Sequence, residues 1–421
     1  MATEEEVGRL RQLVRDRIDL SGSVSDEELT GAIEEAVFEW SRHHPLNSGE
    51  KLSLVKRLFH SFRGLDILQP LLADPSVTEI MINSADEIYI ERAGMMSRHP
   101  ASFESSERLE DIIQSVVAGV NRVVNESSPI VDARLKDGSR VHVVLPPIAL
   151  KGPTLTIRKF PDKPLLMDDL IQLESVTQEA ADFLRLLVAG KYNLFISGGT
   201  GSGKTTFLNA LSQYIPSDER IVTIEDSAEL KIGSVPNLVA LETRNANTEG
   251  KGAIAMRELI RASLRMRPNR IIVGEVRGGE ALDMLQALNT GHDGSLSTGH
   301  SNGPRDMLGR LETMVLSAAD LPVAVIRQQI ASAVDILLHL SRMRDRSRRV
   351  MEICEVTGIR DGEIELNPLF RFEEQSGGGN GDRSERIVGG LRRTHNPLMH
   401  TRKLEMAGLL SRLPEVEVHE H

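Results

Sequence analysis

The segment 193–209 reads NLFISGGTGSGKTTFLN, so that a short apolar run leads into a glycine-rich turn. Residues 198–205 match the pattern G-x-x-x-x-G-K-T of a phosphate-binding loop. Glycines allow backbone N–H groups to approach phosphate oxygens, and the helix expected over 204–214 adds the positive end of its dipole. The expected nucleotide-binding residues are Gly198, Gly199, Thr200, Gly201, Ser202, Gly203, Lys204, Thr205 and Thr206.

The chemistry that this loop indicates is the binding of ATP with Mg²⁺. Lys204 is expected to reach the β- and γ-phosphates, and the hydroxyl of Thr205 is expected to ligate the metal. Hydrolysis also needs an activated water molecule and positive charge at the transition state. These requirements direct attention to carboxylates, histidines and arginines elsewhere in the chain.

Two glutamates follow apolar, strand-like runs downstream of the loop. Glu225 follows IVTI, and Glu275 follows RIIVG. Carboxylates at the carboxyl ends of parallel strands face the crevice in which such sheets bind ligands. Each glutamate suits a metal ligand or a base that polarises water, and we expect Glu275 to join Thr205 at the metal.

Two histidines bracket the next strand-like run, SLSTG. His300 at its end could sense the γ-phosphate, and His292 before it is a second candidate; for both, a structural role is the alternative. Neither pattern resembles a zinc site, because the cysteine ligands are missing.

Three arginines, Arg134, Arg140 and Arg158, lie on or beside strands that we expect to share one sheet, with Asp137-Gly138 as a hairpin turn. Three arginines on a sheet usually form a solvated face. Beside a nucleotide motor, they could instead reach the γ-phosphate of a neighbouring subunit.

The elements that position these residues fall into successive regions. We expect a helical module over 1–62, a mixed α/β domain over 63–160, a proline-containing linker over 161–167 and an ATPase domain over 168–374. In the ATPase domain helices and strands alternate, which predicts a parallel sheet closed by strands near 335–340 and 350–356. A glycine-rich flexible loop and a helical tail, with a helix over 402–413, are expected in 375–421.

Composition limits the function. The net charge is −11 and aromatic residues make up 3 %, and both values argue against general binding of nucleic acid. The single cysteine, Cys354, fits a reducing compartment and a core position, and no apolar run is long enough for a spanning helix. We therefore expect a cytoplasmic protein, with the arginine-rich segment 341–349 either solvated or in peripheral contact with a membrane or a platform protein.

The chain resembles the secretion-ATPase superfamily of type II and type IV secretion (GspE-like), and most closely the CpaF-type ATPases of tight-adherence pilus systems. The resemblance begins near Leu65. It is carried by residues 68–83, 125–141, 145–160, 197–211, 223–230, 241–254 and 265–302. The last of these runs, RMRPNRIIVGEVRGGEALDMLQALNTGHDGSLSTGHSN, covers what the family calls its Walker B and histidine boxes.

The resemblance implies an α/β fold with a RecA-like core, a smaller N-terminal domain and six subunits in a ring. It implies that Glu225 lies in the aspartate box, that Glu275 is the Walker B glutamate and that His300 is the box histidine. The three arginines match N-domain arginines that could act across subunits. Asn269 and Gly299 depart from the pattern of the family.

The implied function is a motor for pilus assembly or protein export at the inner face of the cytoplasmic membrane, working with membrane platform proteins. Type IV or type II secretion ATPases are the nearest alternatives. A nucleic-acid translocase and a non-hydrolysing, nucleotide-gated scaffold are alternatives from other classes.

Overall fold

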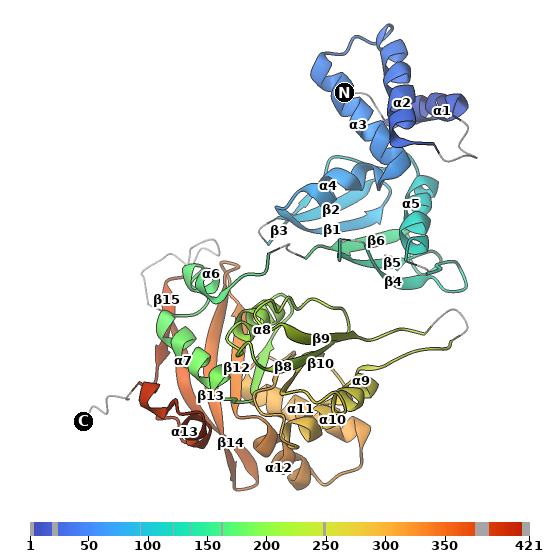
Figure 1. Cartoon of the computed structure of the whole chain (residues 1–421). Coiled ribbons are helices and arrows are strands. Elements are labelled where there is room, and N and C mark those ends of the chain that lie inside the picture. Colours follow the sequence, from blue (N-terminus) through green and yellow to red (C-terminus); the bar gives the residue numbers. More distant parts are fainter. Residues whose placement is uncertain are drawn as a thin grey trace. The chain divides into compact units, whose positions relative to one another are not determined.

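The computed structural model describes residues 4–18, 24–92, 94–120, 122–135, 137–160, 163–246, 250–374 and 387–414. The expected loop at 375–382, and residues 161–162 of the expected linker, lie outside this set. The chain divides into two compact units, Met1–Asp162 and Lys163–His421, and each is described by itself (Figure 1).

Three helices begin the first unit and share a small apolar core. They are α1 (Glu4–Arg17), α2 (Asp26–Ser41) and α3 (Ser48–Arg63). Leu10, Ile33 and Leu58, one from each helix, are fully buried together. Helix α2 begins with a capping box in which Ser25 and Glu28 satisfy each other's backbone N–H groups.

A charged cluster ties these helices to the rest of the first unit. The buried carboxylate of Asp66 lies 2.7 Å from Arg108 and 3.6 Å from Arg11 of α1. Arg11 also pairs with Glu104. The helical module is therefore fixed to the α/β part of this unit, a contact that the sequence did not predict.

An antiparallel sheet forms the α/β part, with the strand order β3-β2-β1-β6-β5-β4 over the described residues. Its buried face packs against the short helix α4 (Gln69–Ala73) and against α5 (Ser106–Ala118), whose apolar side chains share one core with the sheet. The strands are β1 (Val77–Ser84), β2 (Glu87–Arg92), β3 (Met95–Arg98), β4 (Ile130–Arg134), β5 (Arg140–Val144) and β6 (Thr154–Arg158).

The second unit contains a larger sheet with the order β15-β14-β13-β12-β7-β11-β10-β8-β9 in the part of the chain that is described. The six strands from β12 to β9 run parallel, and β13, β14 and β15 extend the sheet in antiparallel fashion. The strands are β7 (Leu194–Gly198), β8 (Arg220–Glu225), β9 (Asn237–Glu242), β10 (Arg270–Val276), β11 (Leu296–Gly299), β12 (Ile336–Arg342), β13 (Arg348–Arg360), β14 (Glu363–Glu374) and β15 (Gly389–Arg393).

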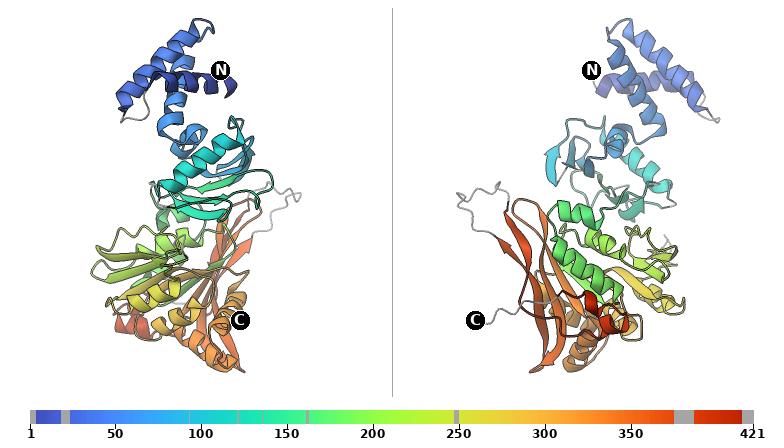
Figure 2. Two further views of the ribbon diagram at one scale, coloured as in Figure 1. Left: turned by 90° about the vertical axis from the view of Figure 1, so that its right-hand side faces the viewer. Right: turned by 60° about the vertical axis from the view of Figure 1, so that its left-hand side comes forward.

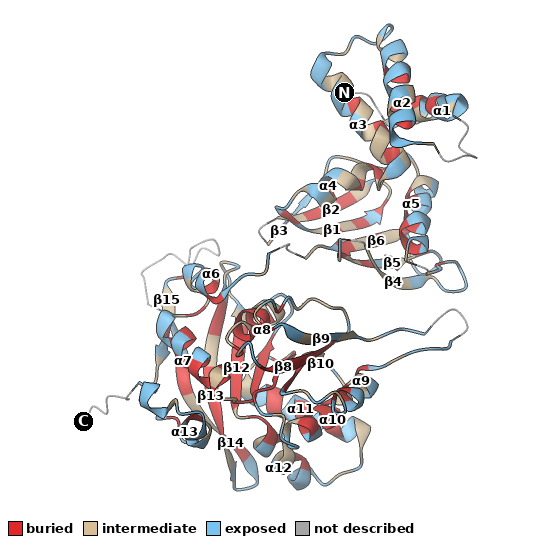
Figure 3. Cartoon of the chain, in the orientation of Figure 1, coloured by how far each residue is buried: buried red, intermediate tan, exposed pale blue. Residues whose placement is uncertain are grey.

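Helices cover both faces of this sheet (Figure 2). One layer contains α6 (Met167–Gln172), α7 (Gln178–Ala189), α8 (Lys204–Ser212) and α13 (Arg402–Met406), and the other contains α9 (Met256–Ser263), α10 (Glu280–Leu288), α11 (Pro304–Ala318) and α12 (Val323–Ala333). Strand residues alternate between the layers: Leu194 and Ile196 pack into the first, and Phe195 packs into the second. The central strands are consequently buried on both faces (Figure 3).

The C-terminal part differs from the expectation of a loop and a helical tail. Strand β15 pairs with β14, and Leu404 of α13 is fully buried in the main core. The helix expected over 402–413 stops at Met406, because Gly408 takes a left-handed conformation (φ +67°), and a short 3₁₀ turn follows at Leu410–Arg412. The sheet therefore does not close at residue 356, and the described tail belongs to its packing.

Candidate active site

The phosphate loop has the backbone that its glycines predict. It runs from the end of the buried strand β7 to Lys204, the first residue of α8. Gly201 and Gly203 have φ of +71° and +94°, which side-chain-bearing residues rarely adopt. At Gly198 an added Cβ would lie 2.4 Å from the carbonyl oxygen of Leu340, so that only glycine fits against the neighbouring strand β12.

The loop suits phosphate oxygens. Gly199, Thr200 and Gly201 are exposed, and a Cβ at Gly199 would meet nothing within 4 Å. The buried hydroxyl of Ser202 has no hydrogen-bond partner among the described residues. An open glycine cradle, an unpartnered donor and a lysine at the helix start are the donor set that the β- and γ-phosphates of ATP require.

Lys204, His300 and Glu275 meet at the carboxyl ends of the parallel strands. The Nζ atom of Lys204 donates to the carbonyl of Gly199 at 3.0 Å and lies 3.4 Å from Nδ1 of His300. Nε2 of His300 lies 2.6 Å from Oε1 of Glu275. Burial and the charge of Lys204 lower the pKa of His300, so the imidazole is neutral near pH 7.

Glu275 also has a cationic partner that the sequence did not identify as such. Its Oε2 atom accepts a hydrogen bond from Nη2 of Arg277 at 2.6 Å, and Nη1 of Arg277 lies 3.8 Å from Asp226 at the end of β8. The carboxylate oxygens of Glu275 and the hydroxyl of Thr205 are hard oxygen donors of the kind that Mg²⁺ prefers. These two residues could hold the ion, which would add positive charge beside the phosphates.

Glu225 ends the neighbouring strand β8 and is only 3 % exposed. Burial raises its pKa to about 7, although the backbone N–H groups of Glu229 and Leu230 donate to its Oε1 atom at 2.9 and 3.0 Å and oppose the shift. A Cβ on Gly274 of β10 would lie 2.8 Å from Cγ of Glu225, so these two strands approach closely here. The carboxyl group is thus fixed by its own loop at the same edge of the sheet.

His292 lies away from this edge. It precedes β11, whereas His300 follows it, and the four residues of that strand separate the two histidines. Nδ1 of His292 lies 3.1 Å from the carbonyl of Ala287, at the end of the strand where Ser295 pairs with Asn193. The prediction that His292 joins the site is therefore not supported by its position.

The three arginines of the first unit share one row of the antiparallel sheet. Arg134 lies opposite Arg140, Arg140 lies opposite Arg158, and Arg158 lies opposite Glu79. Glu79 in turn lies opposite Glu91, so this row is basic on one half and acidic on the other. The three side chains are together, but they belong to a different unit from the phosphate loop.

The arginine-rich segment 341–349 lies beside the phosphate loop. Nε of Arg348 donates to the carbonyl of Gly201 at 3.0 Å. Arg344 pairs with Glu374, and Arg349 is buried against Glu174. Sequence reasoning missed this position, because it depends on β12 pairing with β7, which no local pattern reveals.

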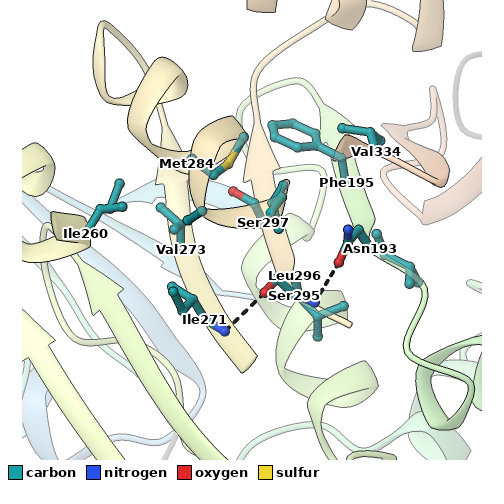
Figure 4. A pocket seen from close by; sticks show the side chains of 13 residues that line it. Asn193, Phe195, Ile260, Ile271, Val273, Met284, Ser295, Leu296, Ser297 and Val334 are labelled. Atoms are coloured by element: carbon teal, nitrogen blue, oxygen red, sulfur yellow. Dashed lines mark hydrogen bonds between the residues drawn. The ribbon is translucent and has the colours of Figure 1, made fainter. Parts of the chain in front are cut away.

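A small cavity lies deeper in the second unit (Figure 4). Its volume is about 10 Å³, about what one water molecule needs. Apolar side chains from β7, β10 and α10 dominate its lining, with Ser295 and Ser297 of the β11 region. None of the expected site residues lines it, so it is a packing gap and not the nucleotide site.

None of the described helices is long and apolar enough to cross a membrane. Among the described residues, no group of three or more His, Cys, Asp or Glu side chains is placed so that it could hold a metal ion.

Comparisons with known proteins place this chain in a family. Residues 62–370 match the family described as "Type II/IV secretion system protein". The chain is 35 % identical over 327 residues to the conjugal transfer protein TrbB of Rhizobium radiobacter, covering 77 % of this chain and 96 % of that protein. It is 35 % identical over 322 residues to the type IV secretion system protein PtlH of Bordetella pertussis, covering 70 % and 95 %.

A solved structure supports the fold. The X-ray structure of the Yersinia pseudotuberculosis ATPase DotB is similar with a TM-score of 0.52 and 18 % identity, covering 69 % of this chain and 78 % of that chain. The family match spans most of the chain and the phosphate loop is fully formed. This chain therefore belongs to the type II/IV secretion system protein family, and it is an ATPase with a RecA-like core and a smaller N-terminal domain.

Proposed function

We propose that this ATPase is the motor that powers assembly or retraction of a tight-adherence, type IV-like pilus, or protein secretion by a related machine. The observation that carries the proposal is the meeting of Lys204, His300 and Glu275 at the carboxyl ends of adjacent strands. The pilus subtype rests on the motif runs at 68–83, 125–141 and 265–302, which resemble CpaF-type ATPases.

In this proposal the backbone of residues 198–206 binds the phosphates of ATP, and Lys204 moves from Gly199 to the β- and γ-phosphates. Glu275 accepts the proton of the attacking water. His300 touches both Lys204 and Glu275, so it can transmit the arrival of the γ-phosphate to the base. Glu225 holds the loop that follows β8 at the same edge of the sheet, by accepting hydrogen bonds from the backbone N–H groups of Glu229 and Leu230.

The test separates binding from turnover. Lys204→Ala should abolish ATP hydrolysis, because it removes the cation that contacts the phosphates. Glu275→Gln should bind ATP but not hydrolyse it, because an amide cannot accept the proton. Glu39→Gln, a change on an exposed helix of the first unit, is the matched control. Wild-type turnover in both Lys204→Ala and Glu275→Gln would contradict the proposal.

A second candidate is a traffic ATPase of a type IV or type II secretion system. The names of the two curated relatives, a conjugal transfer protein and a type IV secretion system protein, favour it. Deletion of the gene distinguishes the two: loss of surface pili supports the pilus motor, whereas loss of a secreted substrate with normal pili supports the traffic ATPase. A strong stimulation of ATP hydrolysis by DNA or RNA would instead favour a nucleic-acid translocase.

The assembly that we propose is a ring of six subunits with composite sites, docked on membrane platform proteins at the inner face of the cytoplasmic membrane. Arg134, Arg140 and Arg158 would supply positive charge to the nucleotide of a neighbouring subunit. Their alignment in one row of the sheet, with Arg158 exposed and Arg134 and Arg140 partly exposed, suits such a role. Direct contact with lipid is a smaller part of the proposal, because Arg344, Arg348 and Arg349 of the basic segment have partners within the chain.

A further inference from the structure

A continuous line of charged and polar groups crosses the active-site edge of the second unit. It begins at Lys204, passes through His300 and Glu275, and continues through Arg277 to Asp226. Lys204 begins α8 after the phosphate loop that follows β7, and the other residues come from the ends of β11, β10 and β8. These four strands lie next to one another in the sheet in this order. A change at one group can therefore affect the next by direct contact.

Both carboxylate oxygens of Glu275 have a close neighbour in this line, but only Oε2 accepts a hydrogen bond, since the buried Oε1 atom has no hydrogen-bond partner among the described residues. Oε1 lies 2.6 Å from Nε2 of His300, and Oε2 accepts from Nη2 of Arg277 at 2.6 Å. A carboxylate that accepts a proton from water needs an oxygen that faces the water molecule. Oε1 is buried against the neutral imidazole of His300 and Oε2 is bonded to Arg277, so neither oxygen is open to a water molecule in this arrangement.

Arg277 has a second acceptor within reach. Nη1 of its guanidinium lies 3.8 Å from Oδ2 of Asp226, a longer contact than its bond to Glu275. The side chain of Arg277 is 54 % exposed and that of Asp226 is 44 % exposed, so both have room to turn. The backbone of Arg277 is fixed, because its N–H group and that of Gly278 both donate to Oε1 of Glu280.

We propose that Arg277 is a positioning residue whose guanidinium group moves between two carboxylate partners, Glu275 and Asp226. When it is paired with Glu275 it keeps this carboxylate from the water molecule, and when it moves to Asp226 it releases Glu275 for hydrolysis. The proposal rests on the proposed function, since it takes Glu275 to be the base. It assigns Asp226 the role of the acceptor that holds the released guanidinium.

The inference predicts opposite effects of two neighbouring substitutions. Arg277→Gln removes the restraint and should raise kcat for ATP about fivefold, and Asp226→Asn removes the second acceptor and should lower kcat by a similar factor. KM should change little in both variants, because neither residue belongs to the phosphate loop. The double variant should behave like Arg277→Gln, because without the arginine there is nothing for Asp226 to hold. A strong loss of kcat in Arg277→Gln would overturn the inference and indicate that Arg277 stabilises charge on the phosphates.

A measurement without turnover locates the guanidinium. Thermal unfolding of single and double variants gives the coupling of Arg277 with Glu275 and with Asp226. Without nucleotide, the stability changes caused by Arg277→Gln and Glu275→Gln should be coupled. The stability changes caused by Arg277→Gln and Asp226→Asn should be nearly additive. With a non-hydrolysable ATP analogue and Mg²⁺, coupling to Asp226 should appear and coupling to Glu275 should weaken. The same coupling pattern with and without the analogue would overturn the inference.

The two hypotheses fail in different ways. If the wild type and Glu275→Gln hydrolyse ATP equally well, the proposed function of Glu275 fails whatever Arg277 does. If Glu275→Gln is inactive but the couplings do not change with the analogue, only the movement of Arg277 between its two partners fails.

Discussion

Nε2 of His300 lies 2.6 Å from Oε1 of Glu275, while the other ring nitrogen faces the ammonium group of Lys204. An ammonium group can only donate, so Nδ1 acts as the acceptor and a neutral imidazole carries its proton on Nε2, close to Oε1 of Glu275, although that oxygen has no hydrogen-bond partner among the described residues. The lowered pKa of His300, caused by burial and by Lys204, agrees with this assignment. Both neighbours of His300 are thus compatible with an uncharged imidazole.

His300→Gln should lower kcat about 10²-fold, which is typical for the loss of one positioned group at a reacting centre. Affinity for ATP should fall much less, because the phosphate loop and Lys204 remain. Steady-state kinetics together with equilibrium binding of a fluorescent ATP analogue would separate the two effects. An equal loss of kcat and affinity would show that His300 serves binding and not the chemical step.

The pH dependence of stability should contain a contribution from Glu225. Burial raises the pKa of this carboxyl group from 4.5 to about 7, so the native state keeps the proton to a higher pH than the unfolded chain does. The corresponding stability is fully present below about pH 4.5 and is lost as the pH rises through about 7, a change on the order of 3 kcal/mol.

Urea unfolding of the wild type and of Glu225→Gln at several values between about pH 5 and pH 8 checks this. Because the glutamine cannot titrate, the variant should lose less stability than the wild type across this range. Parallel pH profiles for the two proteins would contradict the assignment of the raised pKa to Glu225.

Gly198 should be far more sensitive to alanine than its neighbour Gly199. A Cβ at Gly198 would lie 2.4 Å from the carbonyl oxygen of Leu340 and 2.6 Å from the hydroxyl of Ser202, whereas a Cβ at Gly199 would meet nothing within 4 Å. Gly198→Ala should cost about 3 kcal/mol of unfolding free energy, since either the backbone or strand β12 must shift. Gly199→Ala is the matched control and should unfold close to the wild type.

The order of strand, glycine loop and helix was predicted and is confirmed, because it depends on local spacing alone. The placement of Glu275 and His300 at one edge followed from the rule that parallel strands end together. Strands β14 and β15 and the place of Arg348 were not predicted, since they depend on which strands become neighbours in the sheet. His292 was grouped with His300 by its nearness in sequence, although a strand separates the two.

The charged cluster around Asp66 should hold the N-terminal helices on the α/β part of the first unit. Asp66 is 6 % exposed and pairs with Arg108 and Arg11, so Asp66→Asn should destabilise this unit by about 3 kcal/mol by leaving buried guanidinium groups without their counter-charge. Asparagine, like aspartate, can adopt the positive φ of +54° that this position requires, so the substitution adds no backbone strain. Glu39→Gln, which removes an exposed ion pair with Arg17, should change stability by less than about 1 kcal/mol and serves as the control.

Arg140 should act on the nucleotide of a neighbouring subunit. It is the middle of the arginine row, directly opposite both Arg134 and Arg158, and its side chain is about one third exposed with a contact of 3.8 Å to Asp132. A phosphate loop leaves the γ-phosphate accessible to a second subunit, and an arginine supplied in trans raises the rate by on the order of 10³-fold or more. A head-to-tail contact that closes on itself forms a ring in which every site receives such a residue.

Mixing two inactive variants tests this arrangement. Arg140→Ala subunits keep the phosphate loop, and Lys204→Ala subunits keep the arginine. If the sites are shared, mixed rings contain interfaces with an intact loop on one side and an intact arginine on the other, and ATP hydrolysis should recover although neither variant is active alone. The measurement is the rate against the mixing ratio, with native mass spectrometry to show that the rings are mixed, and Glu39→Gln in place of Arg140→Ala as the control. A fully active monomer, or mixed rings without recovered activity, would contradict a role of Arg140 in trans.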